Sequence, residues 1–320
     1  MILALETSCD ETACALVADD GRVRANIVAS QAELHARYGG VVPEIASRRH
    51  LELVAPVIRE ALDTAGLSLD DVDRVAVTQG PGLIGALLVG LQTAKAIAWS
   101  KGLPLVPVDH LHGHVASLFL EPEPLEPPFL CLLASGGHTM LLDVQEHARW
   151  EVLGSTLDDA AGEAFDKGAR LLGLGYPGGA AIDKLARDGD AEAFSFPVAR
   201  VGGLDFSFSG VKTSLLNAVR ELGDEVDARR ADLAASYQHA IVRALVERAE
   251  EAAARIGAER IAVVGGVAAN SKLRASLPTA ALAPLELCTD NAAMIGSAAR
   301  YAQAVPSPRY LALDAYANAR

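Results

Sequence analysis

Short apolar segments alternate with longer amphipathic ones along the chain. Residues 2–8 (ILALETS) have the pattern of a buried strand, and a polar turn separates them from a second apolar segment at residues 13–20. Apolar residues recur every three or four positions from Ser47 to Ala65, which predicts an amphipathic helix that stops at Gly66. Strands and helices alternate in this way throughout, so the pattern predicts an α/β protein with open mixed sheets.

The opening sequence of strand, turn and strand occurs a second time. Residues 129–145 (FLCLLASGGHTMLLDVQ) repeat it directly after a Pro-rich, acidic segment at residues 121–128, and residues 260–270 (RIAVVGGVAAN) again place small residues after a strand. Two domains that each begin with such a hairpin indicate an internally duplicated fold. We place these domains at residues 1–108 and 109–320, with the final helices free to pack back on the first. Further helices are expected at residues 157–172, 211–222, 228–256 and 290–304.

Length and composition agree with two ordinary globular domains. The chain has 320 residues, of which 51% are hydrophobic and 22% are charged. The longest apolar segment, Leu83–Trp99, includes Lys95 and is expected to be a buried helix, not a membrane span. The N-terminus lacks the basic start of a signal peptide. We therefore expect a cytoplasmic protein without a membrane partner.

The net charge of −13 restricts how the chain can bind nucleic acid. Proteins that bind nucleic acid by themselves usually carry the opposite sign, because neutralising phosphates supplies most of the affinity. A nucleic-acid role must therefore rest on a local basic patch or on a partner. Arg37, Arg48, Arg49 and His50 form one candidate patch, and a solvated helix face is the alternative.

Three turns of small residues follow predicted strands, at residues 7–10, 135–138 and 265–270. Such turns let backbone N–H groups approach phosphate oxygens. None has the complete P-loop or dinucleotide-binding pattern, and each alone could be a tight turn. Three in one chain, two of them in matching hairpins, favour a nucleotide or phosphate site.

Three of the eight histidines lie in the run Asp109–His114. His110 and His114 share one face of a helix and could bind one divalent metal, for which Asp290 is the best candidate third ligand. Leu111 stands where a zincin peptidase requires glutamate, so a peptidase is a weak interpretation. The alternatives are solvated histidines at a helix start and, for Asp290, capping of the following helix.

Carboxylates also gather in the middle of the chain. Asp166 and Asp183 neighbour apolar residues and Gly-rich turns, where an aspartate can accept hydrogen bonds from ribose or hold a cation between phosphates. Glu163 and Lys167 have the spacing of an ordinary helical ion pair.

Taken together, these segments resemble the TsaD family. The resemblance extends from Leu3 to about Ala304 and keeps the order and spacing of the family's motifs. Beside His110-x-x-x-His114, the motifs are ETSCDET, GPGLIGALLVGLQTAKAIA, ASGGHT, FDKGARLLGLGYPGG, DFSFSGVKT, GGVAAN and CTDNAAMIG.

The resemblance implies a fold and a set of site residues. The fold is that of the actin and sugar-kinase superfamily, with two duplicated α/β domains around a nucleotide cleft. His110, His114 and Asp290 would hold one divalent metal, iron or zinc, and Asp10 and Glu11 would lie near the reacting centre. The substrate pocket would draw on Leu133, Ala134, Ser135, Gly136, Gly137, Asp166, Gly179, Asp183 and Asn270.

The implied reaction is transfer of threonylcarbamoyl from its adenylate to the exocyclic amine of the adenosine 3′ of the anticodon, in tRNAs that read codons beginning with A. The adenine nucleotide would be this adenylate or ATP. A TsaC-like enzyme would supply the adenylate, and TsaB-like and TsaE-like proteins would assemble with the chain on tRNA. The main alternative is an ATP-dependent small-molecule kinase of the same superfamily, although the first turn lacks the Asp-Gly-Thr pattern usual in such kinases.

Overall fold

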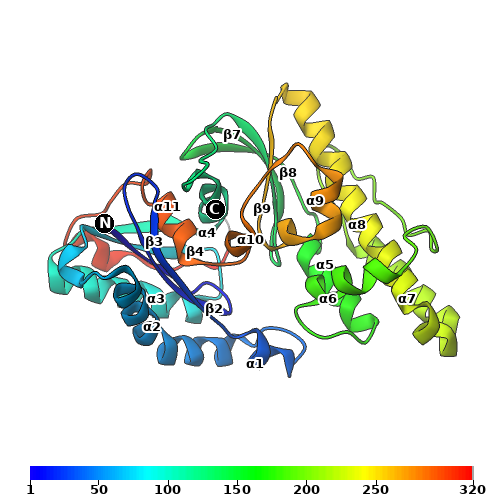
Figure 1. The fold of residues 1–320 in the computed structure, drawn as a ribbon, viewed down its shortest axis with the longest axis horizontal. Helices are drawn as coiled ribbons and strands as arrows, with labels where there is room; N and C mark the ends of the chain where they lie inside the picture. The colour runs from blue at the N-terminus through cyan, green and yellow to red at the C-terminus, as the bar shows by residue number, and fades with distance from the viewer. Residues whose placement is uncertain (319–320) are drawn as a thin grey trace. The chain divides into compact units, whose positions relative to one another are not determined.

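The computed structural model describes residues 1–318, which fall into two compact units (Figure 1). The first unit contains residues 1–126 and the chain from residue 289 onward, and the second is the continuous stretch 127–288. The division therefore differs from the predicted one at residues 108/109. The physical reason is that the segment after residue 109 forms a helix that packs on the returning C-terminal segment of the first unit.

One mixed five-stranded sheet forms the centre of the first unit. Its strands are β1 (Ile2–Glu6), β2 (Glu11–Val17), β3 (Val23–Ser30), β4 (Arg74–Gly80) and β5 (Leu105–Asp109). They lie in the order β3-β2-β1-β4-β5, with β2 antiparallel to both neighbours and β1, β4 and β5 parallel. The two predicted strands at the N-terminus are thus confirmed as a hairpin.

Helices cover both faces of this sheet. Leu3 and Leu5 belong to a buried core that also contains Val57 and Leu91, so this face is covered by the two long helices α2 (Pro43–Ala65) and α3 (Ile84–Lys101). Ala4 points the other way, as alternate strand residues must, and lies beside Gly296. The helices are α1 (Ala32–Ala36), α2 (Pro43–Ala65), α3 (Ile84–Lys101), α4 (His110–Ala116) and α11 (Ala292–Ala298), with 3₁₀ turns at Leu69–Asp71, Ser117–Phe119 and Arg309–Ala312.

The second unit repeats the strand arrangement of the first. Its strands are β6 (Phe129–Ala134), β7 (Thr139–Glu146), β8 (Arg149–Ser155), β9 (Ile261–Val264) and β10 (Ala281–Leu282). Their order is β10-β9-β6-β7-β8, and each pair has the same direction as its counterpart in the first sheet. This correspondence confirms the duplicated fold expected from the repeated hairpins.

A long helix supports the second sheet. Helix α8 packs on β6 and β7, and its Tyr237 hydroxyl donates a hydrogen bond of 2.8 Å to the Ala164 carbonyl. No helix of residues 1–318 is long and apolar enough to cross a membrane. The helices are α5 (Ala161–Leu171), α6 (Gly178–Leu185), α7 (Ser209–Leu222), α8 (Val226–Ile256), α9 (Ser271–Ser276) and α10 (Leu285–Cys288), with 3₁₀ turns at Ala186–Asp188, Gly223–Glu225 and Gly266–Ala269.

Candidate functional site

Helix α4 begins directly at the end of strand β5. The Asp109 carboxylate accepts hydrogen bonds from the backbone N–H groups of Leu111 (2.9 Å) and His112 (3.2 Å), and so caps the helix. Because His110 and His114 are one turn apart on this helix, their side chains project from the same face. The predicted helical spacing of the two histidines is confirmed.

Close packing of α4 on α11 brings both histidines to Asp290. Gly113 lies so near Ile295 that a Cβ at this position would come within 2.7 Å of its side chain. Asn291, not Asp290, caps α11, because its Oδ1 accepts from the backbone N–H of Met294 at 3.0 Å. The capping role considered for Asp290 is therefore wrong, and its carboxylate is directed to the histidines instead.

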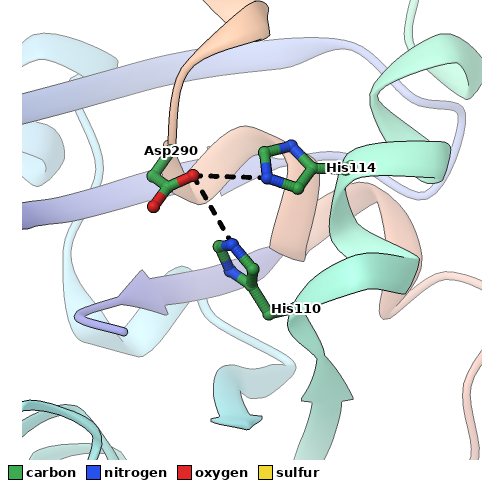
Figure 2. Close-up of side chains that lie close together, drawn as sticks. All are labelled: His110, His114 and Asp290. Carbon is green, nitrogen blue, oxygen red and sulfur yellow. Dashed lines mark ion pairs between the residues drawn. The ribbon is translucent and has the colours of Figure 1, made fainter. Parts of the chain in front are cut away.

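The three side chains converge on one point (Figure 2). The Nε2 atoms of His110 and His114 lie 3.5 and 3.3 Å from Oδ1 of Asp290. One ligand atom from each residue lies within 4.8 Å of the other two. The imidazole rings are nearly perpendicular, with centroids 4.7 Å apart.

The histidines are buried and not solvated, so the solvated alternative is wrong: His110 is 7% exposed and His114 is 0% exposed. Neither ring nitrogen of His114 makes a hydrogen bond to any described residue. An unsatisfied buried polar group is costly unless something else satisfies it. Two imidazoles and one carboxylate form a donor set suited to zinc or non-haem iron, so the residues fit a divalent metal.

The electrostatics of the three residues favour a cation between them. Burial opposes ionisation of Asp290, but the charge of His110 holds the Asp290 pKa below its ordinary value. Burial also opposes protonation of His110, yet the charges of Asp290 and Glu6 raise the His110 pKa well above its usual range. Positive charge is thus stabilised beside these carboxylates.

Asp10 ends the turn of the β1–β2 hairpin of the same unit, and Glu11 is the first residue of β2. The start of α3 holds this turn, because the Leu83 N–H donates to the Ser8 carbonyl at 2.8 Å and the Thr7 hydroxyl donates to the Ala86 carbonyl at 2.9 Å. Burial raises the pKa of Asp10, and the nearby charge of Asp290 adds to this effect. The turn therefore keeps carboxyl groups in a partly desolvated place near Asp290.

Glu11 has the more perturbed carboxyl group. Burial raises its pKa to about 8, the Ser30 hydroxyl that donates to Oε1 at 2.9 Å lowers it, and the charges of Asp10 and Asp290 raise it further. Its other oxygen, Oε2, is buried without a hydrogen bond to any described residue. Such a carboxyl group is able to exchange a proton near neutral pH.

Part of the predicted substrate set forms the turn between β6 and β7 in the second unit. Leu133 and Ala134 end β6, and Ser135 closes the turn through hydrogen bonds with His138. Gly136 and Gly137 at its tip are exposed, and an added Cβ on either would meet no atom within 4 Å. The tip thus offers open backbone N–H groups.

Two glycines enclose this turn, and sequence reasoning recognised only one of them. A Cβ on Gly162, at the start of α5, would lie 2.5 Å from the Ser135 carbonyl oxygen. Gly265 has a φ of +89°, and its Cβ would lie 2.4 Å from the Ala134 carbonyl oxygen. Gly265 belonged to a recognised motif, whereas Gly162 gave no signal because its role depends on the approach of α5.

The remaining predicted substrate residues surround α6 and α9. Asp166 accepts a hydrogen bond of 2.7 Å from the Gly178 N–H, next to Gly179 at the start of α6. Asp183 accepts from the Ser271 hydroxyl at 2.7 Å, beside Asn270. Asn270 caps α9, because its Oδ1 accepts from the Leu273 N–H at 3.0 Å. The polar side chains of Asp166, Asp183 and Asn270 thus all bond the first turns of these two helices.

The proposed basic patch loses one member. Arg37, Arg48 and Arg49 are exposed, but His50 is 0% exposed. Its Nε2 lies 3.0 Å from the Cys9 carbonyl oxygen and its Nδ1 lies 2.8 Å from the Thr12 hydroxyl. His50 therefore holds the hairpin turn and cannot contribute to a surface patch.

Comparison with known proteins gives the family of the chain. The profile of the family described as "TsaD: tRNA N6-adenosine threonylcarbamoyltransferase" matches residues 22–297. The chain belongs to the TsaD family. A TsaD relative named tRNA N6-adenosine threonylcarbamoyltransferase, from Symbiobacterium thermophilum, is 55% identical over 310 residues, which cover 94% of this chain and 91% of that protein. A Clostridium perfringens relative of the same name is 48% identical and covers 100% of this chain and 98% of its own.

Two solved structures support the fold of this TsaD chain. Component A of the (R)-2-hydroxyglutaryl-CoA dehydratase of Acidaminococcus fermentans gives a TM-score of 0.54 at 17% identity and covers 94% of this chain and 96% of its own. Full-length HypF gives 0.59 at 14% identity and covers 94% of this chain and 55% of its own. The TsaD chain thus has the actin and sugar-kinase type of fold predicted from its sequence.

Proposed function

We propose that the chain transfers threonylcarbamoyl from threonylcarbamoyl-adenylate to the exocyclic amine of the adenosine 3′ of the anticodon, in tRNAs that read codons beginning with A. The observation that carries this proposal is the 55% identity with a tRNA N6-adenosine threonylcarbamoyltransferase over nearly the full length of both chains. At such identity and coverage, we expect the polar groups of the sites described above to serve the same reaction in both proteins.

The reaction needs positioning more than a strong nucleophile. The adenylate is a mixed anhydride and is already activated, so the amine nitrogen bonds to the carbamoyl carbon while the bond from that carbon to the phosphate oxygen breaks. The enzyme must align the amine and disperse charge on the departing AMP. Both tasks require fixed hydrogen-bond donors and charges.

The turn after β6 is suited to the phosphate of the adenylate. The backbone N–H groups of Gly136 and Gly137 would donate to its oxygens, since neither glycine carries a side chain that blocks the approach. Asp183 and Asn270 would hold the nucleoside through its hydroxyl and ring polar atoms. Asp166 would keep the start of α6, with Gly179, in place through its bond to Gly178.

His110, His114 and Asp290 would hold one divalent ion, iron or zinc, in the first unit. When bound, the ion would supply Lewis-acid polarisation of a coordinated oxygen. The role of the protein is to hold two imidazoles and one carboxylate together in a buried place, so that the three donors are assembled for the ion.

Glu11 would act as the proton acceptor. Its Oε2 has no hydrogen-bond partner among the described residues, and burial raises its pKa to about 8. The proton released when the exocyclic amine bonds to the carbamoyl carbon would pass to this oxygen. Asp10, beside it in the turn, would orient the amine by accepting its second N–H.

Partners complete this proposal. A TsaC-like enzyme would make the adenylate, and TsaB-like and TsaE-like proteins would assemble with the chain in the cytoplasm, where its tRNA substrate occurs. The net charge of −13 supports the need for partners in tRNA binding. A small-molecule kinase remains the alternative function, but the family match and the buried metal-ligand group favour the transferase.

The test is reconstitution of the modification. The purified chain is incubated with threonylcarbamoyl-adenylate, unmodified tRNA and the partner proteins, and the nucleosides are analysed by mass spectrometry. Threonylcarbamoyladenosine is expected with the wild type and is expected to be strongly reduced with Glu11→Gln. Absence of the product, together with formation of ADP from ATP only when a small hydroxyl compound is added, would favour the kinase.

A further inference from the structure

A further carboxylate, that of Glu6, contacts the metal-ligand group, and the mechanism above does not use it. Glu6, the last residue of β1, is 0% exposed. Its Oε2 lies 3.0 Å from Nδ1 of His110 and accepts a hydrogen bond of 2.6 Å from the Thr78 hydroxyl, and its Oε1 accepts from the Ser8 N–H. Helix α4, strand β4 and the β1–β2 turn thus all contact this one buried side chain of β1.

These contacts determine which nitrogen of His110 carries hydrogen. Both oxygens of Glu6 accept hydrogen bonds, from the Ser8 N–H and the Thr78 hydroxyl, so Glu6 acts as an acceptor and Nδ1 of His110 donates to it. The Ser8 hydroxyl lies 3.2 Å from the same nitrogen. A hydroxyl oxygen can also accept a hydrogen bond, so this contact is compatible with a hydrogen on Nδ1. In the neutral imidazole, Nε2 then presents its lone pair toward Asp290 Oδ1, 3.5 Å away.

The two sides of the His110 ring therefore have different tasks. A lone pair aimed at a carboxylate oxygen is unfavourable unless a proton or a metal cation lies between them, whereas the Nδ1–H bond to Glu6 holds the ring in that orientation. His114 has no such support, since neither of its nitrogens makes a hydrogen bond to a described residue. The site is thus supported on one imidazole only.

We propose that Glu6 is a positioning residue for the metal centre, fixing the tautomer and orientation of His110 and increasing its strength as a ligand. This role rests on the proposed divalent metal at His110, His114 and Asp290. Glu6 touches neither the metal nor the substrate, and it acts through His110 alone. The carboxylate remains on β1 beside His110 because the Ser8 N–H also bonds its other oxygen, Oε1.

Zinc affinity of the full chain tests this role. The metal is removed with a chelator, and Zn²⁺ binding is measured by competition with a chromophoric zinc indicator. Glu6→Gln is expected to weaken Zn²⁺ binding by about 10- to 100-fold. Thr78→Val is the matched control, because it removes a hydrogen bond to the same Glu6 oxygen but leaves the carboxylate and its contact with His110, and is expected to change the affinity little.

A double-mutant cycle shows whether Glu6 acts through His110. The loss caused by Glu6→Gln should disappear in a His110→Ala background and persist in a His114→Ala background. Circular dichroism checks that each variant is folded. Should Glu6→Gln not fold, Glu6→Asp replaces it, since the shorter side chain withdraws the carboxylate from Nδ1 while keeping its charge.

Two results would overturn the role of Glu6. One is a folded Glu6→Gln protein with wild-type zinc affinity, and the other is an equal loss with and without His110. If the wild type and the His110→Ala, His114→Ala double variant bound zinc alike, the metal centre would be wrong and the role of Glu6 with it. That outcome can be told apart from failure of the Glu6 role alone, because it does not involve a change at Glu6. It also leaves the transferase function open, which the modification assay on tRNA tests separately.

Discussion

The carboxyl group of Glu11 is held where its charge is disfavoured, and this has a consequence for stability. Burial raises its pKa from the ordinary 4.5 to about 8 in the folded chain. Folding therefore favours the protonated form, so its contribution to stability is complete below pH 4.5 and is lost as the pH rises to about 8.

We expect Glu11→Gln to remove this pH dependence. Between pH 5 and pH 8, the free energy of unfolding of the metal-free wild type should fall by on the order of 1–3 kcal/mol relative to that of the variant. This energy is smaller than the full pKa shift would give, because the side chain is partly exposed. Urea unfolding of both proteins at the two pH values measures the difference. If the free energy of unfolding changed equally with pH in the two proteins, Glu11 would be a solvated carboxyl group with an ordinary pKa.

The glycines at the turn after β6 differ in what an added methyl group would meet. Gly137 faces open space and its φ lies outside the left-handed region, whereas a Cβ on Gly162 would approach the Ser135 carbonyl oxygen to 2.5 Å. Gly137→Ala should change the free energy of unfolding by less than about 0.5 kcal/mol but weaken adenylate binding roughly tenfold. Gly162→Ala should destabilise the fold by about 1–3 kcal/mol.

Calorimetry and urea unfolding separate the two effects. If Gly137→Ala lost structure while its folded fraction kept the affinity of the wild type, the turn would serve the fold and not the ligand.

Sequence patterns predicted the candidate ligand residues but not the residues that contact them. His110 and His114 were predicted from helical spacing and Asp290 as a distant oxygen donor, and the structure brings these three together. Glu6 carried no sign of its contact with His110, because a glutamate at the end of a strand is usual and its partner lies 104 residues away in the sequence. The same reason hid the burial of His50.

At the scale of elements, α2 is connected to the hairpin by one buried side chain. The ring of His50 bonds Thr12 at the start of β2 and the Cys9 carbonyl in the turn. The helix therefore fixes the segment that carries Asp10 and Glu11.

Replacement of His50 should loosen this connection. His50→Phe keeps the ring volume but removes both hydrogen bonds, and is expected to lower the free energy of unfolding by about 1–3 kcal/mol and to reduce kcat more than it raises KM. His50→Gln, with one donor and one acceptor, should recover part of both losses. Urea unfolding and steady-state kinetics give the comparison, and a His50→Phe protein as stable and active as the wild type would contradict the assignment.

Strongly patterned elements were predicted well, and weakly patterned ones were not. The buried helix expected at Leu83–Trp99 and the helix that ends at Gly66 agree with α3 and α2. Strand β8 was not anticipated, because its exposed and half-buried residues do not alternate clearly. The last helix was expected to reach residue 304 but ends at Ala298, since Arg300 turns away to donate to the carbonyls of Asp19 and Phe119.

At the scale of the whole molecule, charge limits what the chain can bind by itself. A net charge of −13 repels polyphosphate, and the remaining basic candidates near α2 are Arg37, Arg48 and Arg49. Arg49 already pairs with Glu52, which leaves Arg48 as the more available cation.

Reversing Arg48 and Arg49 to Glu should weaken tRNA binding by the assembled complex about tenfold or more and make its salt dependence less steep by about one to two charges. The isolated chain should bind tRNA poorly with or without the change. Binding is measured by fluorescence anisotropy over a salt series, with Arg243 and Arg255 of α8 reversed as the control pair. Tight binding by the isolated chain, unaffected at Arg48 and Arg49, would exclude this patch.

The return of the chain to the first unit affects the order in which the protein is made. Residues 127–288 are one uninterrupted stretch, so the second unit is able to fold as soon as it leaves the ribosome. The first unit has to wait, because α11 and Asp290 belong to it and are synthesised only after the whole second unit. The candidate ligand group is consequently complete only late in biosynthesis, and a truncated nascent chain would present His110 and His114 without their carboxylate.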